Sequence, residues 1–471
     1  MVVQHNMQAA NANRMLNVTT SAQSKSTEKL SSGYKINRAA DDAAGLTISE
    51  KMRKQIKGLD RASTNAEDGV SAVQTAEGAL TEVHSMLQRM NELATQSANG
   101  TNSNTDRKAI QDEIDQLTTE IDRVSETTKF NETYLLKGDG AEKAHNVNAH
   151  DAGLDGVTLA DKGDEVEVTL KTLNAGDKVS IAGKNYTIGG VTADVTTLLD
   201  NAKITGKDGD KVTINGTEYT YYSKADDNNT AVKKAGFFAK QPTAAEAANA
   251  SAAYTVDEIK ALKGATITAG GKSVTTIDDV NGVDKNDSSV ITAAKAYELE
   301  TAEIVKASSI GTDTAATTKA DATADKFTLT KGKVNYNDAL SFNLHVGADA
   351  DMTNKITVNI DSMNSAGLGV KGIKADTEQD ATYAIDAIAD AISTVSSQRS
   401  ALGAVQNRLE HTINNLDNVV ENTTSAESRI RDTDMAEEMV NYSKNNILAQ
   451  AGQSMLAQAN QSNQGVLSLL Q

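Results

Sequence analysis

Apolar residues recur every seven positions near both ends of this 471-residue chain, and a segment of different composition separates the two repeats. Near the N-terminus the repeat consists of Met52, Leu59, Ala66, Val73, Leu80, Leu87 and Ala94. Near the C-terminus it consists of Ile388, Val395, Leu402, Leu409, Leu416, Thr423 and Ile430. A seven-residue repeat held over this length predicts long helices that pack side by side.

The first long helix should begin at Asp41 or Asp42, whose side chains suit an N-cap, and end near residues 98–100. After a polar turn, a second apolar stripe runs from Ile110 to Val124 and should fold back antiparallel on the first helix. Because such stripes cannot bury themselves alone, the N- and C-terminal helices should pack on one another. The residues that we expect to make this packing are Leu59, Val73, Leu80, Leu87, Ile114, Leu117, Ile121, Leu402, Leu409 and Leu416.

The composition supports long helices and thin layers. Only 3% of the residues are aromatic, and there is no Trp, so a large aromatic-centred core is not expected. Pro242 is the single proline of the chain, which permits long uninterrupted helices because proline breaks them.

Both extreme ends are weakly amphipathic and rich in Ala, Gln, Asn and Met. In the last segment the apolar face is formed by Met435, Met439, Ile447, Ala451, Met455 and Ala459. Such ends cannot form a full core in a monomer, so we predict that they are disordered alone and helical beside a neighbouring subunit. The alternative is frayed tails without a role.

The middle of the chain contains an internal repeat. Residues 176–187 closely match residues 209–220, and a weaker third copy covers residues 265–274. Each copy reads as a strand, a tight turn with glycine and a second strand, which predicts β-hairpins.

The predicted fold class is therefore α+β: a long antiparallel, coiled-coil-like helical bundle built from both chain ends, with an inserted β-rich part of two submodules. The expected segments are an N-terminal segment 1–41, N-terminal helices 42–138, a β-rich insertion 139–375, a C-terminal helix 376–431 and a C-terminal segment 432–471.

The net charge of −18 argues against nucleic acid and anionic lipid as partners. The absence of Cys excludes a disulfide scaffold and a thiolate nucleophile. No apolar run is long enough to span a membrane, and the N-terminus lacks the pattern of a cleaved secretory signal. These features leave open a cytoplasmic protein or a protein exported by another route.

No catalytic constellation is convincing. The six His residues form no zinc-protease motif, and a weak metal site from His145, His150 and Asp151 is less favoured than a solvated polar loop. Gly270–Ser273 resembles the end of a phosphate-binding loop, but the residues after it read as a strand, so a hairpin turn is favoured. We therefore predict that the chain is not an enzyme and binds no cofactor and no metal.

Two blocks at opposite ends of the chain resemble bacterial flagellins. The N-terminal block includes Leu30–Ser49, Leu87–Asn99 and Glu120–Val124, and the C-terminal block includes Ala401–Leu409, Ser428–Asp432 and Val466–Leu470. The likeness covers roughly residues 1–140 and 376–471, and the middle resembles nothing that we can name.

The resemblance implies a subunit that leaves the cell unfolded through the flagellar type III export channel and polymerises with itself outside the cell. The terminal segments would form an inner tube, the longer helices an outer tube, and the middle would project into the medium. The implied partners are other subunits, the flagellar cap, an export chaperone and hook-associated proteins, with no nucleic acid and no insertion into a membrane.

The resemblance also implies recognition by the host. The family's motif for the flagellin-sensing Toll-like receptor falls on Gln88, Arg89, Leu93 and Glu113, with Arg89 as the central contact. A simpler interpretation makes Leu93 a packing residue and Arg89 a solvated charge. The segment read by cytosolic flagellin sensors and by the export chaperone falls on Val466, Leu467, Leu469 and Leu470.

The leading hypothesis is thus a structural filament subunit for swimming motility. The alternative is a hook–filament junction protein or another hook-associated protein with similar helical ends. A flagellin that carries an enzyme in its middle and a free-standing adhesin are less favoured.

Overall fold

The computed structural model describes the backbone of residues 6–226, 230–320 and 325–468. The chain forms two compact units, of which the first comprises Met1–Gln74, Ser341–Val358 and Ala401–Gln471. The second unit comprises Thr75–Leu340 and Asn359–Ser400. Two long helices, α2 (Ala43–Ser97) and α7 (Glu378–Arg431), contribute one part to each unit.

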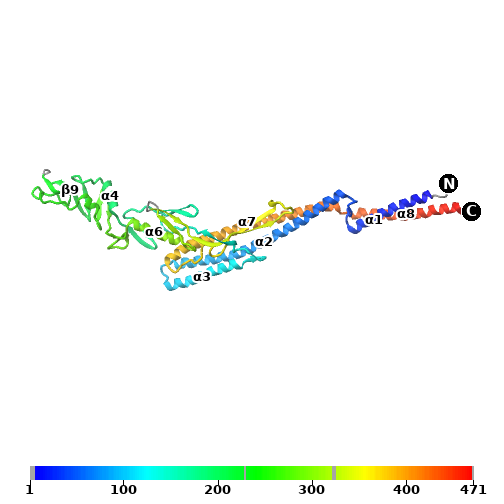
Figure 1. The fold of residues 1–471 in the computed structure, drawn as a ribbon, viewed down its shortest axis with the longest axis horizontal. Helices are drawn as coiled ribbons and strands as arrows, with labels where there is room; N and C mark the ends of the chain where they lie inside the picture. The colour runs from blue at the N-terminus through cyan, green and yellow to red at the C-terminus, as the bar shows by residue number, and fades with distance from the viewer. Residues whose placement is uncertain (1–5, 227–229, 321–324, 469–471) are drawn as a thin grey trace. The chain divides into compact units, whose positions relative to one another are not determined.

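The first unit is mainly helical. Besides its parts of α2 and α7, it contains α1 (Met7–Ser32), the short 3-10 helix η1 (Met352–Asn354), α8 (Met435–Ser468) and most of the strands β19 (Leu340–His345) and β20 (Lys355–Ile360). Helices α1 and α8 lie side by side although they come from opposite ends of the chain (Figure 1). The prediction that the N- and C-terminal helices pack together therefore holds within this unit.

Heptad residues form the small core of the first unit. Leu59 of α2 packs with Leu416 of α7, and Ala66 of α2 packs with Leu409 of α7 and Ile356 of β20. Asp42 caps α2, since its Oδ1 atom accepts a hydrogen bond of 2.9 Å from the Gly45 amide. The predicted cap and the predicted pairing of the stripes are both present.

A hairpin of β19 and β20 lies against α2 where the helix carries a glycine. A Cβ atom added to Gly69 would come within 2.2 Å of the Leu344 Cδ1 atom, so the missing side chain leaves room for the hairpin. The Asn65 side chain donates to the carbonyl oxygen of His345 at 2.9 Å and fixes the strand beside the helix.

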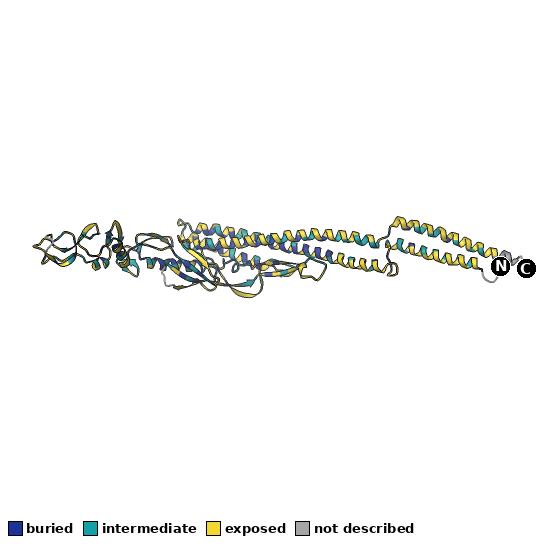
Figure 2. Ribbon diagram, turned by 90° about the horizontal axis from the view of Figure 1, so that it is seen from above, coloured by how far each residue is buried: buried dark blue, intermediate teal, exposed yellow. Residues whose placement is uncertain are grey.

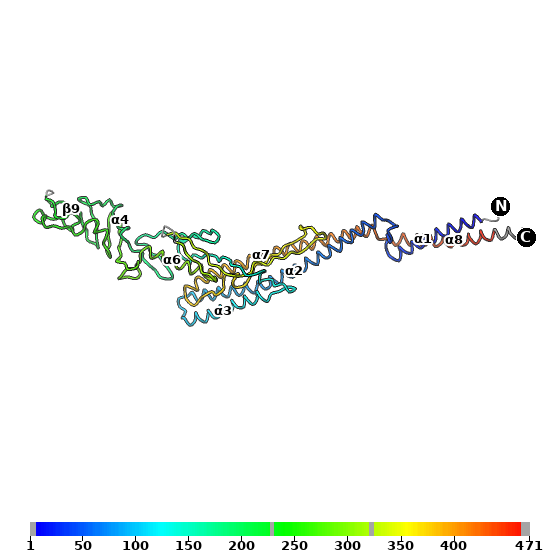
Figure 3. The backbone as a smooth tube through the Cα atoms, in the orientation of Figure 1, coloured from blue at the N-terminus to red at the C-terminus, as the bar shows by residue number. Residues whose placement is uncertain are grey.

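The second unit contains three helices that run side by side: α3 (Asn104–Thr127) and its parts of α2 and α7 (Figure 3). Ser103 and Asp106 form a capping box at the start of α3. Arg107 donates to the carbonyl oxygen of Ser97, so α3 folds back antiparallel on α2 as predicted. Arg399 of α7 pairs with Glu77 of α2 at 2.7 Å.

Short strands make up most of the second unit. One sheet of five strands has the order β10-β9-β8-β11-β12, another has the order β13-β14-β15-β7-β6, and a sheet of four has the order β16-β17-β5-β4. Two-stranded pairs are formed by β1 with β2 and by β18 with β3. The bounds of these strands are β1 (Lys129–Phe130), β2 (Thr133–Tyr134), β3 (Asp139–Asn146), β4 (Thr158–Asp161), β5 (Glu165–Thr169), β6 (Lys178–Ile181), β7 (Lys184–Ile188), β8 (Lys211–Ile214), β9 (Thr217–Lys224), β10 (Ala231–Phe238), β11 (Thr266–Ala269), β12 (Lys272–Thr275), β13 (Asp279–Val280), β14 (Val283–Asp284), β15 (Val290–Ile291), β16 (Thr317–Ala320), β17 (Lys326–Thr330) and β18 (Lys333–Asp338).

The internal repeat predicted from the sequence forms three hairpins. The pair β6–β7 turns at residues 182–183, β8–β9 turns at 215–216, and β11–β12 turns at 270–271. Both residues of each turn have positive φ angles, from 49° at Asn215 to 81° at Gly216 in the second hairpin. This backbone is that of the mirror-image turns that match the twist of paired strands. Gly270–Ser273 therefore belongs to a hairpin and not to a phosphate-binding loop, as predicted.

Two separate apolar clusters lie under these sheets. One joins α6 (Ala293–Ala307) to β5, β6, β7 and β17, and the other joins α4 (Thr192–Asn201) and α5 (Val256–Lys260) to β8, β10 and β11. The α+β class with helical ends and a β-rich middle is confirmed. The exact domain boundaries given above stay predictions.

Candidate assembly surface

The α1–α8 pair is built from two weakly apolar helices. Asn6 caps α1 by accepting a hydrogen bond from the Ala9 amide at 2.9 Å, and Gly33 ends the helix with a φ angle of 77°. The only residue of α1 that is buried is Ser26. The two helices therefore do not form a closed hydrophobic core with each other, and they leave surface available for an interface.

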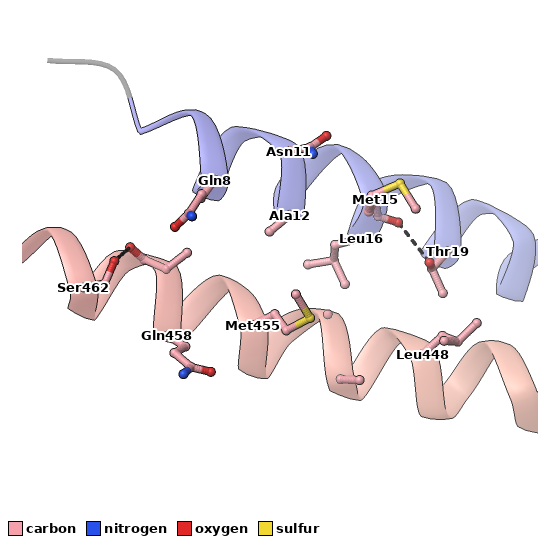
Figure 4. Close-up of a pocket in the computed structure, with 13 residues that line it drawn as sticks. Gln8, Asn11, Ala12, Met15, Leu16, Thr19, Leu448, Met455, Gln458 and Ser462 are labelled. Atoms are coloured by element: carbon pink, nitrogen blue, oxygen red, sulfur yellow. Dashed lines mark hydrogen bonds between the residues drawn. The ribbon is translucent and has the colours of Figure 1, made fainter. Parts of the chain in front are cut away.

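Between the two helices lies an apolar groove of about 690 Å³. Figure 4 shows Leu16 of α1 pointing toward Met455 of α8 across this groove, which Met15 and Leu448 also line. The helices approach closely at Gly452, where an added Cβ atom would lie 3.3 Å from the Leu16 Cδ1 atom. The other residues along the groove are small or polar, so large apolar side chains do not fill it. They are Gln8, Asn11, Ala12, Thr19, Ala451, Gly452, Gln458, Ala459 and Ser462.

The outer faces of the pair also expose large apolar side chains. Val18 of α1 is 59% exposed, and Val440 and Ile447 of α8 are 68% and 67% exposed. Figure 2 shows that exposed residues dominate both helices. A soluble monomer rarely shows an extended apolar surface, and such a surface generally marks an interaction site.

The chain is fastened where α1 and α8 join the long helices. The Arg431 guanidinium lies 4.6 Å from the centre of the Tyr34 ring and pairs with Glu50 at 3.1 Å. The Lys35 amide donates to the Arg431 carbonyl oxygen, and the Thr433 amide donates to the Gly33 carbonyl oxygen at 3.0 Å. These contacts tie the end of α7 and the linker before α8 to the segment that follows α1, and the sequence pattern gave no indication of them.

Comparisons with known proteins identify the family. Residues 3–141 match the bacterial flagellin N-terminal helical region, and residues 385–470 match the bacterial flagellin C-terminal helical region. A flagellin of Clostridium tyrobutyricum is 40% identical over 470 residues, which cover 98% of this chain and 100% of that protein. Polar flagellin A of Vibrio parahaemolyticus is 35% identical over 469 residues, or 99% of each chain.

The chain belongs to the bacterial flagellin family. As a flagellin, it is a structural subunit of the flagellar filament, and other copies of the same chain are its partners in the polymer. The alternative of a hook-associated protein is less supported, because the relatives that match over nearly the whole chain are flagellins.

Among solved structures, FliC from Burkholderia pseudomallei is 18% identical, with a TM-score of 0.26 over 72% of this chain and 99% of that one. The flagellar hook associated protein-3 from Legionella pneumophila is 12% identical, with a TM-score of 0.32 over 81% of this chain and 98% of that one. Both scores are too low for a comparison of the folds.

Three of the four residues predicted for the Toll-like receptor lie on the surface of the flagellin's second unit. Arg89 is half exposed, and its Nε atom donates to the Glu113 carboxylate of α3 at 2.9 Å. A second guanidinium nitrogen donates to Glu92 at 3.2 Å, and the Gln88 side chain lies 3.1 Å from His84. Leu93 is only 2% exposed, so it packs inside the helices and presents almost no surface.

The residues predicted for helix packing are mostly buried in this flagellin. Val73, Leu80, Leu87, Ile114, Ile121, Leu402 and Leu409 have no measurable exposure, Leu59 and Leu416 are also buried, and Leu117 is half-buried. Their part in filament assembly stays a prediction. Val466 and Leu467 lie in α8, but their side chains, like the whole of Leu469 and Leu470, lie outside the described residues.

The metal and membrane predictions concern residues that the structure largely describes. Within the described ranges, no three His, Asp or Glu side chains are grouped to hold a metal ion. No described helix is long and apolar enough to cross a membrane.

The expectation of a polar loop at His145 is wrong, because this residue lies in β3 and its ring stacks on Tyr336 with 4.0 Å between the ring centres.

Proposed function

We propose that this flagellin polymerises when neighbouring subunits cover the groove and the outer apolar faces of the α1–α8 pair. The observation that carries the proposal is the concentration of exposed Met, Val, Ile and Leu side chains on these two helices. Removal of apolar surface from water contributes about 25 cal/mol per Å², which offsets the entropy lost when the helices are fixed. Contacts between different faces of identical subunits do not close, so growth is helical and open-ended.

In this proposal the filament stands outside the cell and serves swimming. The subunit passes unfolded through the type III export channel, meets its export chaperone at Val466, Leu467, Leu469 and Leu470, and adds beneath the flagellar cap. Hook-associated proteins join the base of the filament, and no catalysis, nucleic acid or membrane insertion takes part. The likeness of both ends of the chain to flagellins supports each of these steps.

The proposal is tested by a charge placed in the groove. Leu16→Asp should raise the critical concentration for polymerisation at least about tenfold, because an unpaired carboxylate would be buried when the next subunit docks. The measurement is the concentration of unpolymerised chain left after seeded growth and sedimentation. Electron microscopy should show long uniform filaments for the unaltered chain, whereas a hook-associated protein would give short or absent polymers.

A matched variant separates the groove from a general effect of charge. Thr217→Asp adds the same charge at an exposed hairpin position of the second unit and should leave the critical concentration within about twofold of the unaltered value. Equal critical concentrations for Leu16→Asp and the unaltered chain would refute the part assigned to the groove.

We further propose that the flagellin-sensing Toll-like receptor recognises the α2–α3 surface around Arg89. The guanidinium group of Arg89 is held by the carboxylates of Glu113 and Glu92. Its hydrogen bonds to these carboxylates raise the pKa of Arg89, so the side chain stays charged. A preorganised guanidinium suits a planar, charge-assisted contact with a partner. Gln88 would extend this contact, and the buried Leu93 would support the helix beneath it.

Arg89→Ala should lower the potency of the monomeric flagellin at least about tenfold in a reporter cell that carries the receptor, as expected for an interfacial arginine. Arg123→Ala is the control, since Arg123 is an exposed, paired arginine on α3 with 60% of its side chain accessible. A similar loss of potency in both variants would contradict a specific contact at Arg89.

A further inference from the structure

A pocket of about 230 Å³ opens in the second unit, away from the surfaces assigned above. Four segments form it: the chain after β3, strand β18, the loop of residues 366–369 and one face of α7. Its lining consists of Asn146, Val147, Asn148, His150, Val334, Tyr336, Ala366, Gly367, Leu368, Gly369, Ala387, Asp390 and Thr394. The volume lies below the roughly 300–1,000 Å³ of sites for drug-sized ligands and corresponds to about eight water molecules.

The floor of the pocket is apolar and held in place. Val334, Leu368 and Ala387 are buried, with at most 5% of any of them exposed. The loop that carries Leu368 is fixed by Ser365, whose amide and hydroxyl both donate to the Asp122 carboxylate of α3. The pocket is therefore preformed, which limits the entropy lost when a ligand binds.

Three polar side chains at the pocket keep unused hydrogen-bonding capacity. No hydrogen bond to the Tyr336 hydroxyl or to the His150 ring occurs within the described ranges, whereas the His150 backbone is anchored to Ser308 at 3.0 Å. Asp390 accepts one bond, of 3.1 Å from Asn148 to its Oδ2 atom, and its Oδ1 atom has no donor in the described part of the chain.

The orientation of Tyr336 is fixed as well. Its ring stacks on His145 at an interplanar angle of 18°, so the hydroxyl cannot swing freely. Burial raises the pKa of this hydroxyl, which therefore stays protonated and able to donate.

The charge of the pocket selects against anions. Neither Lys nor Arg belongs to its lining, and Asp390 contributes a carboxylate. Asp386, one turn away on α7, has a pKa raised by burial and also by the nearby Asp151 and Asp390, with His150 acting in the opposite direction. A ligand should therefore be neutral or cationic.

We propose that this pocket binds a single sugar ring of hexose size, neutral or bearing an ammonium group. The Asp390 carboxylate would accept hydrogen bonds from hydroxyls or an ammonium, and the Tyr336 hydroxyl and the His150 ring would engage the remaining hydroxyls. The apolar floor would lie against the C–H face of the ring. An apolar floor beside several polar groups suits a sugar, which has both hydroxyls and a C–H face.

The test is a titration of the full-length monomeric chain with three sugars of the same ring size: glucose, glucosamine and glucuronate. Methyl signals of Val334 and Leu368 should shift in a saturable way with glucose and glucosamine, with dissociation constants in the millimolar range. Glucuronate should bind at least tenfold more weakly, because its carboxylate meets Asp390.

Variants decide whether these shifts arise in the pocket. Asp390→Asn should weaken glucosamine at least tenfold and reduce the discrimination against glucuronate. Tyr336→Phe, which removes only the hydroxyl, should weaken both glucose and glucosamine. Asp349→Asn, at an exposed acid of the other unit, should change nothing. The absence of saturable shifts with all three sugars, or equal binding by Asp390→Asn and Asp349→Asn, would overturn the proposal.

Discussion

A chain trimmed to residues 41–431 is expected to form no filaments at concentrations at which the full chain polymerises completely. The trimmed chain lacks α1 and α8, and with them the groove and more than half of the exposed large apolar side chains of the described structure. It keeps Asp42, the cap of α2, and all of α7. The loss should therefore concern assembly and leave the remaining helices folded.

Seeded growth followed by sedimentation and negative-stain microscopy measures this effect. The control is thermal unfolding of the second unit, which contains none of the removed residues and should melt at the temperature found for the full chain. If the trimmed chain still grew normal filaments, the α1–α8 pair would not be the assembly surface.

The second large effect is expected for Glu300→Gln, which should increase the stability of the folded state by an amount that depends on pH. Glu300 of α6 is 7% exposed, and burial raises its pKa from 4.5 to about 7. Its neighbour Glu303 is also buried but is paired with Lys306 at 2.8 Å and accepts a hydrogen bond of 2.6 Å from the Tyr383 hydroxyl. Glu300 makes no ion pair with the described residues, so its ionised form is the costly one.

The direction of the pH effect follows from this raised pKa. A carboxyl that titrates at a higher pH in the folded state favours folding fully below the unfolded value of about 4.5 and loses that contribution as the pH rises through about 7. Glu300→Gln stays neutral, so it should leave stability nearly unchanged at pH 4 and increase it by about 1–3 kcal/mol at pH 8.

Amide hydrogen exchange of α6 at the two pH values, corrected for the intrinsic rate, measures the change locally. Glu298→Gln is the matched control, because Glu298 lies on the same helix with 68% of its side chain exposed. A variant at Glu300 that is no more protected than the control at pH 8 would show that the buried carboxylate is accommodated without cost.

The repeats with a short period were predictable from the sequence. The stripe through Leu59 and Ala66 predicted a helix that packs on a partner helix, because a seven-residue period leaves no other way to bury it. The turn at Asn215–Gly216 predicted its hairpin, because both residues tolerate positive φ angles. In each case the information lies within a few consecutive turns of chain.

The pairings between distant strands were not predictable in the same way. Strand β5 pairs with β17, so that Val168 lies opposite Phe327, and β3 pairs with β18, so that His145 lies opposite Val334. Nothing local in any of these strands specifies a partner more than a hundred residues away. The placement of His145 was wrong for this reason, since its polar neighbours suggested a loop.

The candidate sites, too, were only partly predictable from the sequence. Arg89 and Leu93 were located by resemblance, but only the structure separates the exposed cation from the buried leucine. Tyr336, His150 and Asp390 lie in three segments without a common motif, so no reading of the sequence joins them. The contact between the Tyr34 ring and the Arg431 guanidinium also joins opposite ends of the chain.

The hairpin of β8 and β9 combines strands that the core holds in place with a tip that has room around it. Its strands are held by their antiparallel pairing and by Val212 and Ile214, which face the core. At the tip, no atom lies within 4 Å of a Cβ atom built on Gly216, although its φ angle of 81° favours glycine within the tight turn itself. A longer loop could therefore replace the two-residue turn at a cost of about 0.6 kcal/mol for each doubling of its length, without any adjustment of the strands beneath.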